Sequence, residues 1–239
     1  MTETVPCEAN LIVKGVVKRF GELISEAEKR IIEGIEEGRL ETEPSITDRF
    51  LEAIESVFES EGDHDGIIFK ARTLRDRGKG APEKEFGADF CGALDIKFDD
   101  FEQRKGFLSQ SKSEGDWVSV RRTPYGVTAV SFDQNKEFER LKGQTEDMLS
   151  ITPDSFVFVY SRGGFVVVPA SSVEGLKIGA ELYAKRVDRF FKEYLMCFIG
   201  DHRLKGWDDN SLRALREKTN SRTAILFQIQ EAEIKVVFS

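Results

Sequence analysis

The chain has 239 residues, of which 40% are hydrophobic and 10% aromatic, and its formal net charge is −8. This length predicts one domain with a sizeable core, and the aromatic content argues against disorder. No apolar run reaches the roughly 18–20 residues of a membrane span, and residues 1–10 lack the order of a signal peptide. With 3 Cys and 2 His, a disulfide framework and a structural zinc site are disfavoured, and a cytoplasmic location is expected.

The charge is distributed unevenly along the chain. Residues 1–66 hold 7 Lys/Arg and 17 Asp/Glu, whereas residues 67–239 hold 28 and 26. A net negative charge usually disfavours nucleic acid as a partner, but here it describes mainly the N-terminal part. A basic cluster follows it, formed by Lys70, Arg72, Arg75, Arg77, Lys79 and Lys84. Such a cluster is also compatible with an ordinary solvated surface.

Two helices are predicted in the acidic part. Apolar residues recur at helical spacing from 10 to 37, with Gly21 as a candidate break. A second helix is expected to begin near Pro44–Ser45, because proline suits a first turn and Ser45 with Asp48 resembles a capping box.

The rest of the chain alternates between strand and helix patterns. Strands are expected at 67–74, 88–98, 106–112, 117–120, 127–132, 156–160, 165–168 and 224–230. Helices are expected at 136–149, 181–198 and 211–218. Gly and Pro predict a mobile basic loop at 75–87, and 99–104 reads as a polar hairpin connection. This order predicts an α/β fold around a central sheet.

Several common catalytic sites are absent from the sequence. There is no GxSxG elbow, no glycine-rich loop ending in GK[ST] and no HExxH. His64 and His202 offer poor material for a Ser–His or Cys–His triad. Carboxylates, amides and lysines remain, and they suit a hard, oxygen-liganded metal such as Mg²⁺.

One strand pair carries residues suited to such a metal. Gln110 and Lys112 are two apart on a predicted strand, so their side chains share one face. Asp89 lies 21 positions before Gln110, across a hairpin-length connection. Asp89 and the Gln110 amide could then hold one cation, with the Lys112 ammonium over the attacking water or the scissile phosphate. Each residue also has a plain structural interpretation, as a turn cap, a surface amide and a solvated strand end.

This D…QxK pattern resembles the PD-(D/E)xK nuclease superfamily, in the subset similar to Mrr-type restriction enzymes. The resemblance implies a restriction-endonuclease-like αβββαβ core over residues 43–170, with a mixed central sheet flanked by helices. In this single domain, 1–239, residues 1–42 would be an N-terminal helical extension and residues 171–239 would add C-terminal helices and a strand. Ala88 stands where the family's motif has proline.

The resemblance also implies an activity, a cofactor and further site residues. The expected reaction is Mg²⁺-dependent hydrolysis of phosphodiester bonds in DNA, with Mn²⁺ as a substitute and a restriction or anti-phage role. Glu43 or Glu83 would supply an extra acid, and Gln144 matches a glutamine that some members place near the substrate or the metal-site water. The basic cluster would clamp backbone phosphates.

Two other hypotheses remain open at this stage. The chain could be a nuclease-fold module that binds nucleic acid or a partner subunit without cutting. It could also be an α/β interaction protein whose acidic helices, residues 10–60, form an oligomer interface. Gln in place of the second acid, the small size and the lack of a targeting module favour the first of these alternatives.

Overall fold

The computed structural model describes residues 7–75, 88–122, 128–133, 135–177 and 180–232, with side chains from residue 14 onward. In chain order the elements are α1 (Cys7–Glu36), α2 (Glu43–Glu61), β1 (Asp63–His64), β2 (Ile67–Arg75), β3 (Phe90–Phe98), β4 (Phe101–Ser113), β5 (Val118–Arg122), β6 (Thr128–Phe132), α3 (Lys136–Ile151), β7 (Ser155–Tyr160), β8 (Val166–Pro169), α4 (Ala170–Glu174), β9 (Leu182–Arg186), α5 (Val187–Leu195), α6 (Asp209–Lys218) and β10 (Thr223–Glu231). The fold is α/β, as predicted.

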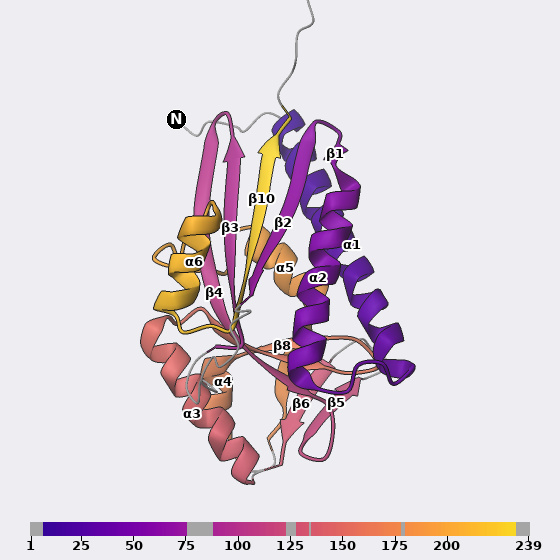
Figure 1. Ribbon diagram of the computed structural model, residues 1–239, viewed down its shortest axis with the longest axis vertical. Coiled ribbons are helices and arrows are strands. Elements are labelled where there is room, and N and C mark those ends of the chain that lie inside the picture. Colours follow the sequence, from indigo (N-terminus) through magenta and orange to yellow (C-terminus); the bar gives the residue numbers. More distant parts are fainter. Residues whose placement is uncertain (1–6, 76–87, 123–127, 134, 178–179, 233–239) are drawn as a thin grey trace, which may run out of the picture.

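The strands form one mixed ten-stranded sheet in the order β1-β2-β10-β3-β4-β7-β8-β9-β6-β5 (Figure 1). The long strand β4 joins its two halves, because its first part pairs antiparallel with β3 and its last part pairs parallel with β7. The C-terminal strand β10 is inserted between β2 and β3 and runs parallel to β3. The consecutive strands β2, β3 and β4 therefore do not form a simple meander, because β10 separates β2 from β3.

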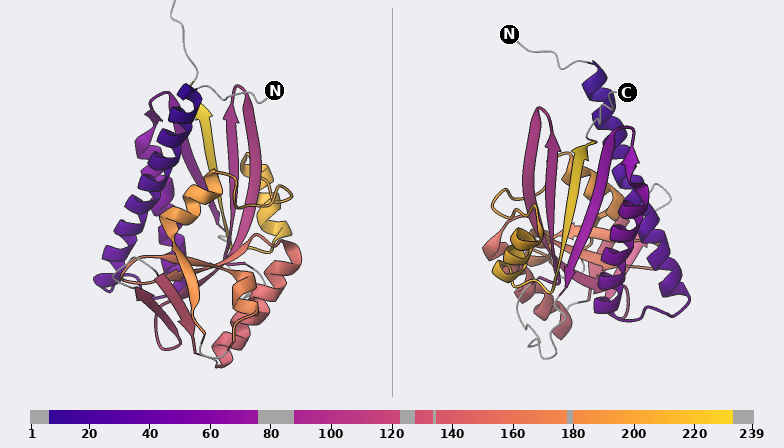
Figure 2. Two further views of the ribbon diagram at one scale, coloured as in Figure 1. Left: turned by 180° about the vertical axis from the view of Figure 1, so that it is seen from behind. Right: turned by 45° about the horizontal axis from the view of Figure 1, so that its top comes forward.

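Both faces of the sheet are covered, and side chains alternate between them as a pleated strand requires. On β10, Ile225 and Phe227 enter the core under α1, α2 and α5, whereas Leu226 packs on the other face with α6 residues. The helices α5 and α6 lie on opposite sides of the long strands (Figures 1 and 2).

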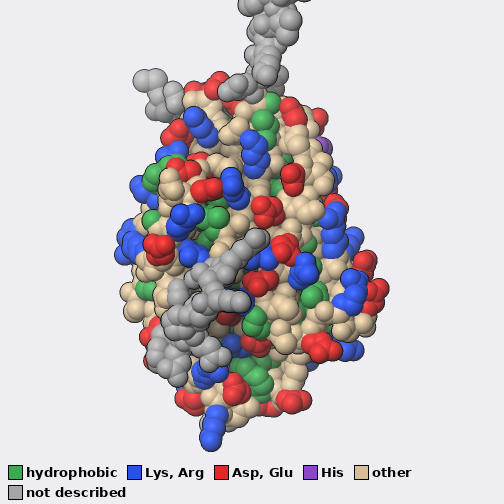
Figure 3. Space-filling view, in the orientation of Figure 1, with side chains coloured by type: hydrophobic (Ala, Val, Ile, Leu, Met, Phe, Trp, Pro, Cys, Tyr) green, Lys and Arg blue, Asp and Glu red, His purple; other side chains and the backbone are tan. Residues whose placement is uncertain are grey.

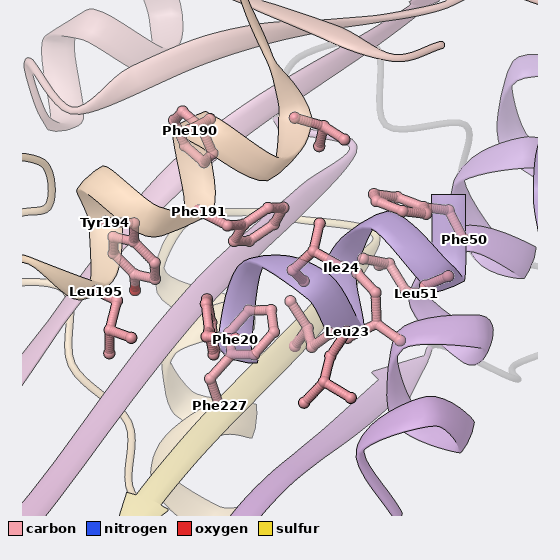
Figure 4. Close-up of a cluster of buried hydrophobic side chains, with 14 of the residues drawn as sticks. Phe20, Leu23, Ile24, Phe50, Leu51, Phe190, Phe191, Tyr194, Leu195 and Phe227 are labelled. Atoms are coloured by element: carbon pink, nitrogen blue, oxygen red, sulfur yellow. The ribbon is translucent and has the colours of Figure 1, made fainter. Parts of the chain in front are cut away.

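The larger core is rich in aromatic rings. Phe20 of α1 lies 5.5 Å from the Phe227 ring and 6.4 Å from the Phe191 ring of α5, between ring centroids (Figure 4). Phe191 lies 5.3 Å from Phe227 in turn. Aromatic pairs at this spacing contribute beyond the area that they bury, so the cluster fastens α1 and α5 to the inserted strand.

The N-terminal helices form where the pattern predicts, with two local differences. The helix α1 continues through Gly21, where a Cβ would collide with the Lys192 side chain, so glycine serves close helix packing there. The N-cap of α2 is Thr42 and not Ser45: the Thr42 backbone is extended, and its hydroxyl accepts a hydrogen bond from the Ser45 amide at 3.4 Å.

Residues 181–198 were predicted as one helix, and that prediction is wrong. The chain forms strand β9 first and helix α5 only from Val187 to Leu195. The strand fills the gap between β8 and β6, and its pairing satisfies the backbone groups of both neighbours. Phe198, the last residue of the predicted helix, lies beyond α5 and is 76% exposed.

The hairpin connection is also shorter than the polar residues 99–104 suggested. Strand β4 begins at Phe101, which pairs with Phe98, so the turn is only Asp99 and Asp100. Cross-strand pairing holds the polar residues 102–104 in the ladder, because backbone hydrogen bonds do not depend on side-chain polarity.

Charged side chains of both signs are interspersed over the face seen in Figure 3. Within the described part of the chain, no helix is long and apolar enough to cross a membrane. The distribution of charged side chains thus does not make the face seen in Figure 3 either acidic or basic.

Glu28 of α1 is a buried carboxylate whose protonation should affect stability. It is 3% exposed, and it accepts a hydrogen bond from the Phe165 amide at 2.5 Å. Burial raises the pKa of Glu28 above 4.5. A raised pKa in the folded state means that stability is greatest below the unfolded value and falls as pH rises through the folded value.

We therefore expect Glu28→Gln, which keeps an acceptor oxygen, to gain stability over the wild type as pH rises from about 5 to about 8. Thermal unfolding at both pH values checks this, with the exposed Glu26→Gln as control. A variant that loses more stability at the higher pH would show instead that the charge is favourable, through Arg186 at 3.7 Å.

Candidate functional site

The β3–β4 hairpin brings the first two motif residues together. Because Phe90 pairs with Ser109, Asp89 immediately before β3 lies beside the next residue of β4. The Gln110 Nε2 donates to Asp89 Oδ2 at 2.7 Å, and the Ser111 amide donates to the same oxygen at 2.8 Å. One Asp89 oxygen is therefore held by two donors.

The start of α2 brings Glu43 beside Lys112, which lies on the same strand as Gln110. Glu43 is the first residue of α2, where the helix dipole favours a carboxylate. Its Oε1 accepts from the Ser113 amide at 3.1 Å, and its Oε2 lies 3.5 Å from Lys112 Nζ. Asp89, Gln110, Lys112 and Glu43 thus converge at the carboxyl end of β4.

The site is buried at its base and partly exposed at its rim. Gln110 is 3% and Lys112 8% exposed, whereas the Glu43 side chain is 33% exposed. Burial raises the pKa of Asp89, and the charge of Lys112 and the Ser111 N–H oppose that rise. A further positive charge beside Asp89 would favour its ionised form.

Within the part of the chain that the structure describes, two buried amide oxygens have no hydrogen-bond partner, Gln110 Oε1 of β4 and Gln144 Oε1 of α3. The helix α3, which carries Gln144, lies in the connection between the parallel strands β4 and β7 and contacts both strands. Met148 of α3 shares a core cluster with Leu108 of β4. Gln144 is one helical turn before Met148, about 5.4 Å, and Gln110 is about 6.6 Å beyond Leu108. Because Gln110 has the same strand alternation as Leu108, its side chain lies on the face of the sheet that α3 covers.

The oxygen atoms of this site are of the type that binds a hard cation such as Mg²⁺. Unpartnered amide oxygens are costly when buried, and they are ligands that Mg²⁺ or Ca²⁺ accepts alongside carboxylates. Within the described ranges, no group of three or more His, Cys, Asp or Glu could hold a metal ion. A cation here would therefore depend on Asp89, Glu43 and the amide oxygen of Gln110 together.

The predicted basic cluster is only partly within the described residues. Arg77, Lys79, Lys84 and the second candidate acid Glu83 lie outside them, as does most of the loop predicted at 75–87. Lys70 is exposed on β2. Arg72 pairs with Asp209 at 2.9 Å, and Arg75 pairs with Glu52 and donates to the Asp48 carbonyl at 2.6 Å. Arg72 and Arg75 would have to exchange these partners to bind phosphate.

Arg222 is a cation near the site that sequence reasoning missed. Its amide donates to the Ala88 carbonyl at 3.2 Å, beside Asp89. Its guanidinium lies 3.3 Å from Asp48 and contributes to holding down the pKa of Asp89. Its Nε is buried and has no partner among the residues that the structure describes. No local pattern marks Arg222, because only the insertion of β10 beside β3 brings it there.

A buried hydroxyl network supports the site from the opposite face. The Tyr160 hydroxyl lies 3.1 Å from both Thr47 Oγ1 on α2 and Ser111 Oγ on β4. Burial raises the pKa of Tyr160, so the phenol remains neutral and able to donate. The network joins α2, β4 and β7, and so fixes Glu43 relative to the motif strand.

Comparisons with models of known protein families, with curated proteins and with solved structures found no match for this chain. Only the chemistry of its own residues therefore bears on its function.

Proposed function

We propose that this protein is a Mg²⁺-dependent nuclease that hydrolyses phosphodiester bonds in DNA. The observation that carries the proposal is the convergence of Asp89, Gln110, Lys112 and Glu43 at the end of β4, with the Gln110 oxygen buried and unpartnered. When the short strand β1 and the strand pair β5–β6 are set aside as insertions, the order α2, β2, β3, β4, α3, β7 follows the αβββαβ order of the PD-(D/E)xK superfamily. The inserted β10 is an addition to that plan.

Each residue has a role that its contacts suit. Asp89, Gln110 and Glu43 would hold the cation, which when bound polarises a phosphoryl oxygen and lowers the pKa of water. Lys112 provides a compact positive charge for the attacking water or the phosphate. Glu43 lies 3.5 Å from the Lys112 ammonium, so the carboxylate that would hold the cation also positions this charge.

The test is cleavage by the full chain. Closed circular and linear DNA are incubated with the protein in Mg²⁺, in Mn²⁺ and in EDTA. We expect products in either divalent ion and none in EDTA, because the proposed reaction needs the cation to polarise the phosphate and to lower the pKa of water. Cleavage that persists in EDTA, or no cleavage of any DNA, would contradict the proposal.

A second candidate is a module of the same fold that binds DNA or a partner subunit without cutting it. The absence of a third carboxylate among the described residues of the site favours it, because Gln110 is a neutral ligand. Salt-sensitive DNA binding without cleavage in any divalent ion would identify this candidate. A homodimer, a partner subunit and a cytoplasmic restriction or defence role remain proposals in either case.

A further inference from the structure

A cavity of about 440 Å³ opens at the carboxyl ends of the parallel strands β4 and β7. Its lining includes Ser113 at the end of β4 and Tyr160 at the end of β7. Ligands of α/β proteins commonly bind outside the carboxyl ends of parallel strands. The volume lies in the range of small-molecule sites, about 300–1,000 Å³, which admits one nucleotide and excludes a duplex.

The walls of the cavity differ in chemistry. Leu40 and Ile46, from the α1–α2 connection and from α2, supply an apolar side. The carboxylates of Glu41 and Glu114 and the guanidinium of Arg162 stand around the opening, where all three residues are exposed. The two carboxylates repel phosphate, whereas a base can pack on the aliphatic wall and under an arginine plane.

Ser113 connects this cavity with the candidate site. Its amide donates to Glu43 at 3.1 Å, and Glu43 contacts Lys112. Its hydroxyl oxygen, in contrast, is buried and has no hydrogen-bond partner among the described residues. A buried hydroxyl without a partner is destabilising, so an acceptor or donor supplied by a ligand would account for it.

We propose that this cavity receives the base of one unpaired nucleotide next to the phosphodiester bond that is cleaved. The proposal rests on the proposed nuclease function and defines its substrate class. Extracting a base from a duplex costs unpairing and unstacking, which is least for a base that is already single-stranded. The enzyme therefore acts on single strands, flaps and strand ends in preference to continuous duplex.

The first test measures binding of a deoxynucleoside monophosphate to the full chain in EDTA, by calorimetry or by NMR. Ser113→Ala and Arg162→Ala should each weaken binding about 3- to 10-fold, because the first removes one hydrogen bond and the second removes one stacking contact. Arg213→Ala, an exposed arginine on α6, is the matched control. Ser113→Ala should also leave thermal stability unchanged or higher, whereas a purely structural role for the hydroxyl predicts a loss. Absence of nucleotide binding would overturn the inference.

The second test compares single-stranded, flapped and closed circular DNA as substrates in Mg²⁺. The wild type should cleave the unpaired substrates at least about 10-fold faster, and Arg162→Ala should reduce that preference. If the wild type cleaves closed duplex as fast as single strands, the inference fails while the proposed function stands. If it cleaves nothing, the proposed function fails, and nucleotide binding still decides whether the cavity is a base site.

Discussion

Replacing Asp89 with asparagine should reduce DNA cleavage in Mg²⁺ by at least about 100-fold. Loss of a residue that only supports a metal ligand already costs up to about 100-fold in activity, and loss of the ligand itself should cost at least as much. The change keeps the size of the side chain and one oxygen that can accept from the Ser111 amide. Since burial raises the pKa of Asp89, the neutral amide should not destabilise the fold in EDTA. The variant should thus lose activity while its thermal unfolding temperature stays the same or rises.

Two comparisons make this result specific. Asp95→Asn changes an acid on β3, the strand that follows Asp89; Asp95 is 9% exposed and paired with Arg104, and the variant should keep full cleavage. Lys112→Met should match the loss at Asp89, whereas Lys97→Met on exposed β3 surface should not. Equal cleavage by the wild type, the Asp89 variant and the Lys112 variant would rule out a catalytic centre here.

Replacing Gln110 with glutamate should make the stability of the protein depend strongly on divalent cations. The Gln110 amide donates to Asp89 at 2.7 Å, and a carboxylate in its place would face another carboxylate at that distance. One of the two must then take up a proton or move apart. Holding a glutamate of pKa near 4.3 protonated at pH 7 costs up to about 4 kcal/mol, so destabilisation of that order is expected in EDTA.

Mg²⁺ or Mn²⁺ should reverse this loss, because a cation that binds only the folded state stabilises by about 2.7 kcal/mol at 100 times its Kd. Denaturant unfolding of the Gln110→Glu variant with and without the ion measures the effect. The control is Gln103→Glu, seven positions earlier on the same strand, whose stability should not respond to the ion. A Gln110 variant that stays unstable at saturating Mg²⁺ would show that the amide oxygen does not face a cation.

The elements that the sequence predicted well are those in which local pattern and final environment agree. The helix α3 buries Phe138, Leu141, Thr145 and Met148, the stripe its spacing predicts, because one face of a helix packs on one face of a sheet. The strands β7 and β8 are apolar on both faces and are buried on both, as in most interior strands.

The elements that it predicted poorly are those fixed by distant partners. Residues 182–186 carry a sequence compatible with a helix, and only the open backbone groups of β8 and β6 make them a strand. Likewise, nothing in residues 223–231 reveals that they will enter the sheet between β2 and β3, far from their neighbours in the chain.

For the candidate site, the sequence alone determined which residues can share a face. Strand alternation puts Gln110 and Lys112 on one side of β4, and a short turn brings Asp89 to the same end of the hairpin. Only the tertiary structure showed which groups surround them: Glu43 at the start of α2, one of the two acids that the resemblance suggested, Arg222 just before β10, and the Tyr160 network from β7. Periodicity acts over a few residues, whereas these contacts arise from the packing of helices and the order of strands, which single positions do not encode.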